Sequence, residues 1–367
     1  MKKIISVVGA RPNFIKIAPI HKAFLKYQDC IQHLICHTGQ HFDRKMSSIF
    51  FDELEIPKPD FSLGIGGGSH AEQTARIMMA FEKILLQEEP DLVIVPGDVN
   101  STLAASLTAA KLHIPVAHIE AGLRSFDRDM PEEINRVLTD EISDLLFVTE
   151  KSGMENLLNE GVRESRIFFT GNVMIDSLVQ YLPKIERSGI LSALDVKKQE
   201  YVLSTFHRPS NVDHPDRLKK ILENMKRLAV TLPVIFPIHP RTRNNIKQFG
   251  LEGILPENVI LLDPIGYIDF LALTKEAALV LTDSGGIQEE TTFMGVPCIT
   301  VRNNTERPVT CDVGTNYLAG QDYAKAIDKA FEILNGNRKK GEIPERWDGK
   351  AAPRIVKIVA EYLKAKT

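Results

Sequence analysis

The sequence of 367 residues carries 45 Lys and Arg against 48 Asp and Glu, which gives a formal net charge of −3 at pH 7. That balance argues against a non-specific nucleic-acid partner, because such proteins need an excess of basic surface. Charged residues make up 25% of the chain and hydrophobic residues 43%. These are globular values, which exclude disorder or a fibre. The length suffices for two domains of about 150–200 residues each.

The chain has no predicted targeting or membrane-spanning segment. The first apolar run, Ile4–Val8, ends at Gly9 and is shorter than a signal peptide's apolar core of about 7–15 residues. It predicts a buried strand, and no stretch approaches about 18 apolar residues. The cysteines form no C-x-x-C pair and no metal-ligand spacing, so we expect reduced thiols, no bound metal and a cytoplasmic location. The four cysteines are Cys30, Cys36, Cys298 and Cys311.

Short apolar runs recur along the chain, each followed by a turn and then by a helical pattern such as 71–86 or 102–112. The runs are continuous rather than alternating, which is typical of parallel sheets covered on both faces. The alternation predicts an α/β fold of two Rossmann-like domains with doubly wound parallel sheets. The first series comprises Ile4–Val8, Leu92–Val95, Val116–Ile119, Leu145–Val148 and Ile167–Phe169, and the second comprises Tyr201–Ser204, Val234–Pro237, Val259–Leu262, Leu279–Thr282 and Cys298–Val301.

The spacing of the two series sets the expected domain boundaries. We expect an N-terminal domain over residues 1–172, a connection without strands over 173–199 and a C-terminal domain over 200–351. A final helix over 352–367 is expected to pack back on the first domain. Ligands of parallel sheets bind at the carboxyl ends of the strands. The sequence therefore predicts an active site in the cleft where both sets of strand ends converge.

Two turns between a strand and a helix are candidate anion sites. The first is Gly9–Asn13, where free backbone N–H groups and the positive end of a helix would meet an anion, with Arg11 and Lys16 nearby. An ordinary turn with surface charges is the alternative. The turn is not G-x-G-x-x-G, so no NAD cofactor is expected.

The second turn, Asp283-Ser284-Gly285-Gly286, gives a stronger anion signal. Ser284, Gly285 and Gly286 would let a diphosphate approach the backbone at the start of a helix. Glu290, expected in the first turn of that helix, would accept hydrogen bonds from the hydroxyls of a ribose. Its alternative role is simple complementarity to the helix dipole.

Three carboxylates follow strands of the first domain: Asp98, Glu120 and Glu132. Carboxylates at strand ends lie at the ligand-binding edge of a parallel sheet. Mutual repulsion and partial burial would suit them to proton transfer. A single loop acid is usually solvated or caps a helix, but three on neighbouring loops favour a functional cluster.

Histidines follow two strands of the second domain. His207 and Arg208 come after the strand 201–204, where the imidazole would face the acids and the guanidinium would bind phosphate or order the loop. His239 follows the strand 234–237, and a structural role is an equal alternative for it.

Taken together, these motifs resemble the non-hydrolysing UDP-N-acetylglucosamine 2-epimerases. The resemblance runs from Gly9 to Asn316, and the combined pattern is far more specific than any single piece. The motifs in chain order are GARPNFIKIAPI, HTGQH, GDVNSTLA, HIEAGLRS, MPEEINR, TGNVMID, FHRPSN, DSGGIQEE and NTERPVT.

The resemblance implies an isomerase of glycosyltransferase-B architecture that needs no cofactor. In this family UDP leaves the anomeric carbon as the neighbouring carbon loses a proton, which gives 2-acetamidoglucal, and both return to form UDP-N-acetylmannosamine. It also implies a homodimer that feeds polysaccharide assembly, with no nucleic-acid or membrane partner. The implied catalytic residues are Asp98, Glu120, Glu132 and His207; the implied substrate contacts are Arg11, Lys16, Arg136, Arg208, His239, Ser284, Gly285, Gly286 and Glu290.

The sequence also departs from the common bacterial pattern. An activator site in many relatives uses Q-H-x-x-M and a later arginine, whereas here Gln40 and His41 are separated from Met46 by four residues. Asn303 and Val309 stand where commoner members have acids. The NTERPVT version resembles a branch that includes epimerases of UDP-2,3-diacetamido uronic sugars, which is therefore an alternative substrate class.

Three other functions remain as alternatives. A glycosyltransferase of the same architecture would bind UDP at the same turn but needs no trio of carboxylates. A hydrolysing epimerase would release free UDP and N-acetylmannosamine. A regulator that binds a nucleotide sugar would bind UDP without turnover.

Overall fold

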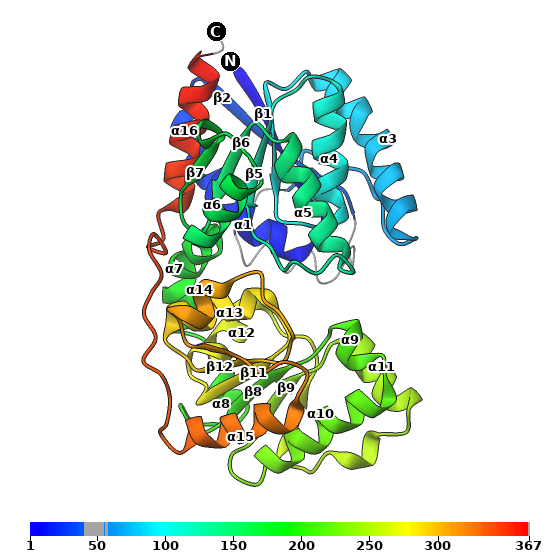
Figure 1. The fold of residues 1–367 in the computed structure, drawn as a ribbon, viewed down its shortest axis with the longest axis vertical. Helices are drawn as coiled ribbons and strands as arrows, with labels where there is room; N and C mark the ends of the chain where they lie inside the picture. The colour runs from blue at the N-terminus through cyan, green and yellow to red at the C-terminus, as the bar shows by residue number, and fades with distance from the viewer. Residues whose placement is uncertain (40–54, 56–57, 366–367) are drawn as a thin grey trace. The chain divides into compact units, whose positions relative to one another are not determined.

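Two separate parallel sheets form the framework of the protein, in a computed structural model that describes residues 1–39, 55 and 58–365 (Figure 1). Unit 1 comprises Met1–Gln180 and Glu345–Thr367, and unit 2 comprises Tyr181–Pro344. All strand pairings described in both sheets are parallel. The prediction of an α/β fold with two parallel sheets is confirmed. None of the helices described is both long and apolar enough to cross a bilayer.

The sheet of unit 1 has the order β3-β2-β1-β4-β5-β6-β7. The chain builds outward in one direction from β1 and then in the other from β4, so the strand order reverses between these two neighbours. Such a switch point places loops of both halves at the carboxyl edge of the sheet. The strands are β1 (Lys2–Val8), β2 (Ile31–His37), β3 (Phe61–Ser62), β4 (Leu92–Pro96), β5 (Val116–Ala121), β6 (Leu145–Val148) and β7 (Ile167–Phe169).

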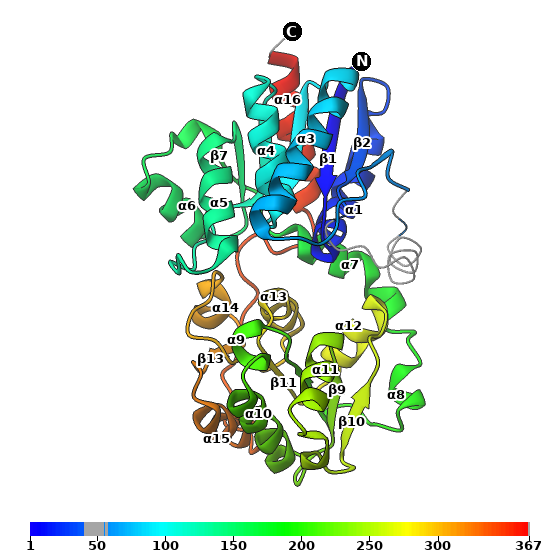
Figure 2. The same cartoon turned by 90° about the vertical axis from the view of Figure 1, so that its right-hand side faces the viewer.

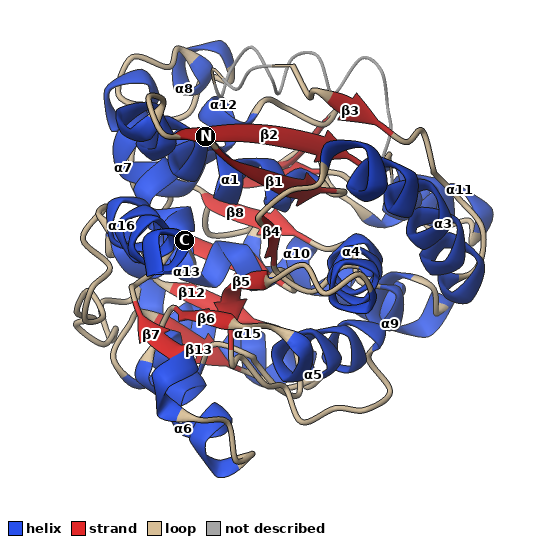
Figure 3. Ribbon diagram, turned by 90° about the horizontal axis from the view of Figure 1, so that it is seen from above, coloured by secondary structure: helices blue, strands red, loops and turns tan. Residues whose placement is uncertain are grey.

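Helices cover both faces of this sheet. Helices α3, α4 and α5 lie together on one side, and α16 lies on the other against α1 (Figures 1 and 3). The helices are α1 (Arg11–Phe24), α3 (His70–Glu88), α4 (Asn100–Lys111), α5 (Pro131–Ile142), α6 (Lys151–Asn159), α7 (Val173–Ile185) and α16 (Ala351–Ala365).

The last segment of the chain is anchored in unit 1 by buried polar contacts. The indole N–H of Trp347 donates to the Thr149 carbonyl at 3.0 Å. The Asp176 carboxylate on α7 accepts from the first backbone N–H groups of α16, those of Ala351 and Ala352, at 3.0 and 2.7 Å. This carboxylate stabilises the positive end of α16. Burial nevertheless raises the pKa of Asp176 to about 6.

The sheet of unit 2 has the order β10-β9-β8-β11-β12-β13, with α12 and α13 on one side and α10 and α15 on the other (Figure 2). Its strands are β8 (Val202–Thr205), β9 (Val234–Pro237), β10 (Val259–Leu262), β11 (Leu279–Thr282), β12 (Cys298–Thr300) and β13 (Asn316–Leu318). Its helices are α8 (Ile190–Ala193), α9 (Pro209–Val212), α10 (Pro215–Leu228), α11 (Pro240–Gln248), α12 (Tyr267–Lys275), α13 (Gly285–Met294), α14 (Pro308–Asp312) and α15 (Tyr323–Leu334).

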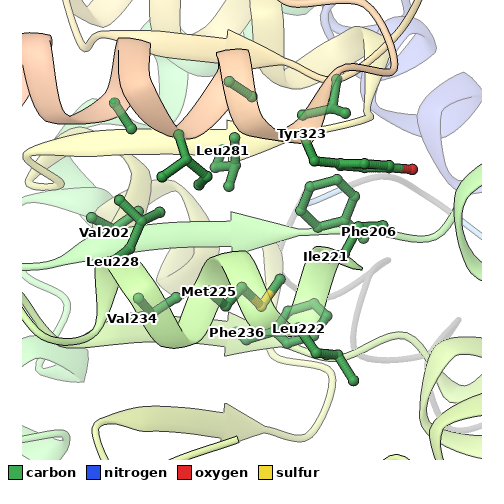
Figure 4. Close-up of a cluster of buried hydrophobic side chains, with 14 of the residues drawn as sticks. Val202, Phe206, Ile221, Leu222, Met225, Leu228, Val234, Phe236, Leu281 and Tyr323 are labelled. Atoms are coloured by element: carbon green, nitrogen blue, oxygen red, sulfur yellow. The ribbon is translucent and has the colours of Figure 1, made fainter. Parts of the chain in front are cut away.

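Alternate residues of these strands build two hydrophobic cores. Val202 faces the core beneath α10 and α15, where Met225 and Tyr323 pack (Figure 4). Its neighbours Tyr201 and Leu203 face the opposite core, beneath α12 and α13. Successive side chains of a strand point to opposite faces. The continuous apolar runs of the sequence are therefore explained by a sheet buried on both faces.

Strands β2, β3 and β13 were not predicted from the sequence. In β2 the apolar run is interrupted by Gln32 and His33. The structure explains His33, because its ring nitrogens bond to Ser6 Oγ at 2.7 Å and to His21 Nδ1 at 2.9 Å. Hydrogen bonds to neighbouring elements let a polar residue continue a mostly buried strand.

The buried histidine predicts acid sensitivity of unit 1. Burial, with a smaller effect of His21, lowers the pKa of His33 from 6.5 to about 3. The unfolded chain binds a proton on this histidine near pH 6.5, whereas the folded protein does not. The contribution of His33 to stability is therefore full above that pH and is lost as the pH falls below it. Between pH 7 and 5 we expect the free energy of unfolding to drop by about 2 kcal/mol through this group. Urea unfolding at both pH values, followed by emission of the single tryptophan, Trp347, measures unit 1.

The variant His33→Gln should lose most of this pH dependence. The exposed His214 of unit 2 provides the matched control, and His214→Gln should retain the full drop. An unchanged drop in His33→Gln would contradict the assignment.

Candidate active site

The first turn between strand and helix, Gly9–Asn13, is closed by its own side chain. The N–H groups of Gly9 and Ala10 donate to Asn13 Oδ1 at 3.1 and 2.9 Å, and Asn13 Nδ2 donates to the Pro96 carbonyl at 3.0 Å. The prediction that these backbone N–H groups are free for an anion is therefore wrong for Gly9 and Ala10. The asparagine instead ties the start of α1 to the end of β4.

Lys16 and Glu120 form a buried ion pair at the carboxyl edge of the sheet of unit 1. Lys16 Nζ on α1 donates to Glu120 Oε2 at the end of β5. Only 7% of the Lys16 side chain and 2% of the Glu120 side chain are exposed. Charges at such depth are maintained by pairing and hydrogen bonding. Sequence reasoning named both residues but not their contact.

Because Gly97 has no side chain, it leaves room for the ion pair of Lys16 and Glu120. A Cβ on Gly97 would lie 3.0 Å from Lys16 Nζ and 3.4 Å from Glu120 Oε2. Its φ of +68° also belongs to the left-handed region that glycine adopts without strain. Gly97 therefore has two physical reasons to be glycine, and sequence reasoning assigned it no role.

The backbone at Glu120 is strained. Glu120 has a φ of +75°, and the register between β5 and β6 shifts between Ile119 and Ala121. An extra residue in a strand is a β-bulge, which redirects side chains and is frequent at functional sites. A left-handed conformation is unfavourable for a residue other than glycine and is held by its surroundings. The bulge thus sets the direction of the Glu120 carboxylate.

Asp98 and Glu132 are linked to this edge through α5. Arg136 Nη2 donates to Asp98 Oδ2 at 2.6 Å, and the Arg136 side chain is buried. Glu132 lies one helical turn before Arg136, in the first turn of α5, and is half-buried. Asp98 directly follows Gly97, whose Cβ position would touch Glu120. The structure therefore brings Asp98 and Glu120 to one edge of the sheet, while Glu132 lies on the helix whose Arg136 binds Asp98.

The adjacent Glu133 has a different role from Glu132. Its carboxylate accepts from Ser125 N and Oγ at 2.9 and 2.8 Å and from Phe126 N at 3.0 Å. It therefore holds the loop that follows β5. The two neighbouring glutamates therefore differ: Glu133 is buried and holds this loop, whereas Glu132, the predicted acid, is half-buried.

In unit 2, Asp283 organises the loop that carries His207 and Arg208. The buried carboxylate accepts from the backbone N–H of both residues at 2.9–3.2 Å and from Asn211 Nδ2 at 3.0 Å. It also contacts His207 Nδ1 at 3.0 Å, while 44% of the His207 side chain is exposed. Burial alone would raise the pKa of Asp283, but His207 and these donors hold it below its usual value.

The predicted anion turn lies at the start of α13, and two unpredicted arginines surround it. Helix α13 begins at Gly285 and its Ser284 N-cap makes no side-chain capping bond to the first turn. A Cβ on Gly285 would lie 3.2 Å from Arg307 Nη1 and 3.9 Å from Arg302 Nη1. Helix dipole and guanidinium groups both favour an anion there.

Buried carboxylates hold these arginines in place. Glu306 binds Arg302 Nη1 and Nη2 at 3.0 and 2.7 Å, and Glu289 Oε1 accepts from Arg307 Nε at 2.6 Å. Arg208 Nη2 also approaches Glu306 Oε1, at 3.9 Å. The NTERPVT motif contains both Glu306 and Arg307. These two charged residues were the feature of the sequence from which this cluster could have been predicted.

Two of the predicted substrate contacts, Glu290 and His239, form hydrogen bonds within unit 2. Glu290 lies in the second turn of α13, because the helix starts two residues earlier than expected, so the prediction of a first-turn position is wrong. It is 3% exposed, and Tyr267 Oη donates to its Oε1 at 2.9 Å. His239 caps α11, and its Nδ1 accepts from Arg241 N at 3.2 Å.

Some predictions concern residues outside the described part of the chain. Gln40, His41 and Met46 of the activator pattern lie outside the described residues. The activator hypothesis therefore remains a prediction. Within residues 1–39, 55 and 58–365, no three His, Cys, Asp or Glu side chains lie close enough to hold a metal ion.

Two parallel sheets, with an acid–cation cluster in unit 1 and a turn suited to an anion in unit 2, are typical of an α/β nucleotide-sugar enzyme of glycosyltransferase-B architecture. The family model described as UDP-N-acetylglucosamine 2-epimerase matches residues 24–360. The chain belongs to this family of isomerases.

Individual relatives agree with this family. The UDP-N-acetylglucosamine 2-epimerase of Methanocaldococcus jannaschii is 46% identical over 97% of this chain and 98% of its own. A crystal structure of the enzyme from that organism, in complex with UDP-GlcNAc and UDP, matches with a TM-score of 0.91 at 45% identity, over 98% of this chain and 100% of that one. The UDP-2,3-diacetamido-2,3-dideoxy-D-glucuronate 2-epimerase of Pseudomonas aeruginosa is 43% identical over 98% and 99% of the two chains.

Gly97→Ala tests the close packing around the ion pair. The added methyl group would crowd Lys16 and Glu120, whereas Gly161, with a φ of +84°, has open space around its Cβ position. Each variant should lose about 1 kcal/mol of the free energy of unfolding, because alanine is unfavourable in the left-handed backbone conformation. Gly97→Ala should lose about 2 kcal/mol more through overpacking. Urea unfolding followed by Trp347 emission compares the two variants, and equal losses would contradict the proposed crowding.

Proposed function

We propose that the protein interconverts UDP-N-acetylglucosamine and UDP-N-acetylmannosamine by elimination and re-addition of UDP. A carboxylate takes the proton from carbon 2 as the bond between carbon 1 and the UDP oxygen breaks. This leaves 2-acetamidoglucal and UDP. Proton return to the opposite face of carbon 2 and re-addition of UDP at carbon 1 complete the reaction. No electron leaves the substrate, so the reaction requires no redox cofactor.

The cluster of acids and cations in unit 1 supports the proton-transfer part of this proposal. Asp98, Glu120 and Glu132 are the proposed acids and bases, and general acid–base groups contribute about 10²–10⁴-fold each. Lys16 and Arg136 hold Glu120 and Asp98 through direct ion pairs. Fixed carboxylates at one sheet edge supply the positioning that such a reaction needs. This arrangement is the observation on which the proposal chiefly rests.

The anion turn of unit 2 supports binding of the nucleotide. Ser284, Gly285 and Gly286 are proposed to hold the diphosphate at the start of α13. Arg302 and Arg307 would add positive charge there, because their guanidinium groups lie next to Gly285. Preorganised donors of this kind stabilise a departing anion, each by about 3–4 kcal/mol.

Further contacts complete the proposed substrate site. Glu290 would accept from the ribose hydroxyls, and Arg11 and Arg208 would contact the sugar nucleotide. His207, held through Nδ1 by Asp283, would present Nε2 to the leaving UDP. His239 is a proposed contact through its ring, which lies 6.1 Å from that of His207 between centroids.

The cellular setting is also proposed. Family resemblance suggests a homodimer that acts in the cytoplasm and supplies sugar nucleotides for polysaccharide assembly. The four cysteines are free thiols, as is usual in a reducing compartment.

A UDP-2,3-diacetamido uronic sugar is the second candidate substrate. The Pseudomonas aeruginosa enzyme with that named substrate is nearly as similar as the archaeal relative. The reaction at carbon 2 would be the same for both substrates.

Incubation in heavy water tests the reaction class. The protein should exchange the proton on carbon 2 of UDP-N-acetylglucosamine for deuterium and form UDP-N-acetylmannosamine, with no free UDP accumulating. Parallel incubation with the diacetamido uronic substrate separates the two candidates. Free UDP with free N-acetylmannosamine would indicate a hydrolysing epimerase. Binding of UDP with no exchange on either substrate would contradict the proposal.

The amide variants Asp98→Asn, Glu120→Gln and Glu132→Gln test the proposed acids. Each should lower turnover at least ~100-fold, because an amide cannot transfer the proton. Binding of UDP, measured by calorimetry, should change little because unit 2 supplies the diphosphate site. Glu82→Gln, at an exposed position of α3, should keep the wild-type rate. Near-normal rates in all three variants would refute the assignment.

A further inference from the structure

A fully buried histidine lies beneath the acids of unit 1. His118 is in the middle of β5, two residues before Glu120, and its ring is 0% exposed. Its Nε2 lies 2.7 Å from the Gly97 carbonyl oxygen, and its Nδ1 lies 2.6 Å from Asp140 Oδ1 on α5. Both ring nitrogens are therefore within hydrogen-bond distance of oxygen atoms.

The partners of His118 determine its protonation state. A carbonyl oxygen only accepts, so Nε2 must carry a hydrogen. The second oxygen of Asp140 accepts from Arg124 Nη1 at 2.7 Å and from Gly122 N at 3.0 Å. These two donors, one of them the permanently charged Arg124 guanidinium, favour the ionised form of Asp140. An ionised Asp140 also only accepts, so Nδ1 carries a hydrogen too, and the ring is an imidazolium.

This ion pair joins the three elements that carry the acids. Gly97, which receives the Nε2 bond, directly precedes Asp98. His118 shares β5 with Glu120, and Asp140 shares α5 with Glu132. Asp140 also binds Gly122 N, immediately after the strained bulge. The side chains of His118 and Asp140 therefore link Gly97, β5 and α5, the segments that carry or adjoin the three carboxylates.

The environment makes this pair rigid. Arg124, which bonds to Asp140, is in turn held by Glu160 through Nε and Nη2 at 2.8 and 2.6 Å. Buried ion pairs of this kind seldom add stability compared with apolar packing, but a fully bonded network fixes geometry. A device that fixes geometry is needed here because Glu120 adopts an unfavourable backbone conformation.

We propose that the His118 imidazolium and Asp140 are positioning residues that set the mutual placement of Asp98, Glu120 and Glu132. This inference rests on the proposed epimerase function only for its kinetic consequence. The imidazolium itself is a property of the folded protein and is tested without substrate.

Nitrogen NMR of wild-type protein labelled with ¹⁵N-histidine tests the protonation state. At pH 8, where exposed histidines are neutral, one histidine should show both ring nitrogens protonated. This signal should disappear in His118→Phe, which assigns it. A ring with one unprotonated nitrogen at His118 would overturn the inference, and this measurement on the wild type needs no variant to fold.

Kinetics of three variants test the positioning role. His118→Phe and Asp140→Leu remove the hydrogen bonds and should lower kcat about 10–100-fold, since small misplacements of reacting groups have effects of that order. The KM and the affinity for UDP should change little. Asp140→Asn should restore most of kcat, because its amide can donate to Nδ1 of a neutral ring whose Nε2–H still reaches Gly97. Thr139→Val, at the buried position next to Asp140, should retain the wild-type kcat.

Rates are expressed per molecule with native Trp347 emission, so a folding defect does not imitate a catalytic one. Wild-type kcat in folded His118→Phe or Asp140→Leu would overturn the positioning role. Failure of the function itself is a separate result, since wild-type protein would then exchange no proton at carbon 2 of either substrate.

Discussion

A charged side chain cannot remain in a protein interior unless an opposite charge or several hydrogen bonds accompany it. The edge of the sheet in unit 1 is organised by this constraint. The Glu120 carboxylate is almost fully buried and meets Lys16 from another element. For the two groups to meet, α1 must begin close to β4, Gly97 must have no side chain, and β5 must bulge at Glu120.

The same constraint shapes unit 2. Asp283 is buried beneath His207, and Glu306 is buried against Arg302. The two arginines next to Gly285 thus each have a buried carboxylate partner, Glu306 for Arg302 and Glu289 for Arg307. Such pairs are expensive to bury and seldom improve stability over apolar packing. We interpret them as devices that hold charged groups in fixed directions, which is what stabilisation of a departing diphosphate demands.

These networks also separate residues that contact substrate from residues that support them. In unit 1, the proposed acids are placed on the side of the network toward the carboxyl edge, and His118 and Asp140 lie beneath. In unit 2, His207 is half-exposed whereas Asp283 is completely buried. In unit 2 a buried carboxylate orients a half-exposed imidazole, and in unit 1 we propose that a buried imidazolium orients carboxylates nearer the edge of the sheet.

The fold class and most strands were predictable from the sequence, because uninterrupted apolar runs and strand–helix alternation are local properties. The sequence also led to the proposed acids, since carboxylates that follow strands are expected to share one edge of a parallel sheet. Strand β2 was not predicted because His33 interrupts its apolar run, and the hydrogen bonds to Ser6 and His21 that accommodate this residue are tertiary contacts. Three contacts became visible only in the folded protein: the pairing of Lys16 with Glu120, the closure of Gly9 and Ala10 by Asn13, and the contact of Asp140 with His118. Each joins residues on different elements, and no local pattern encodes which distant partner a buried charge will meet.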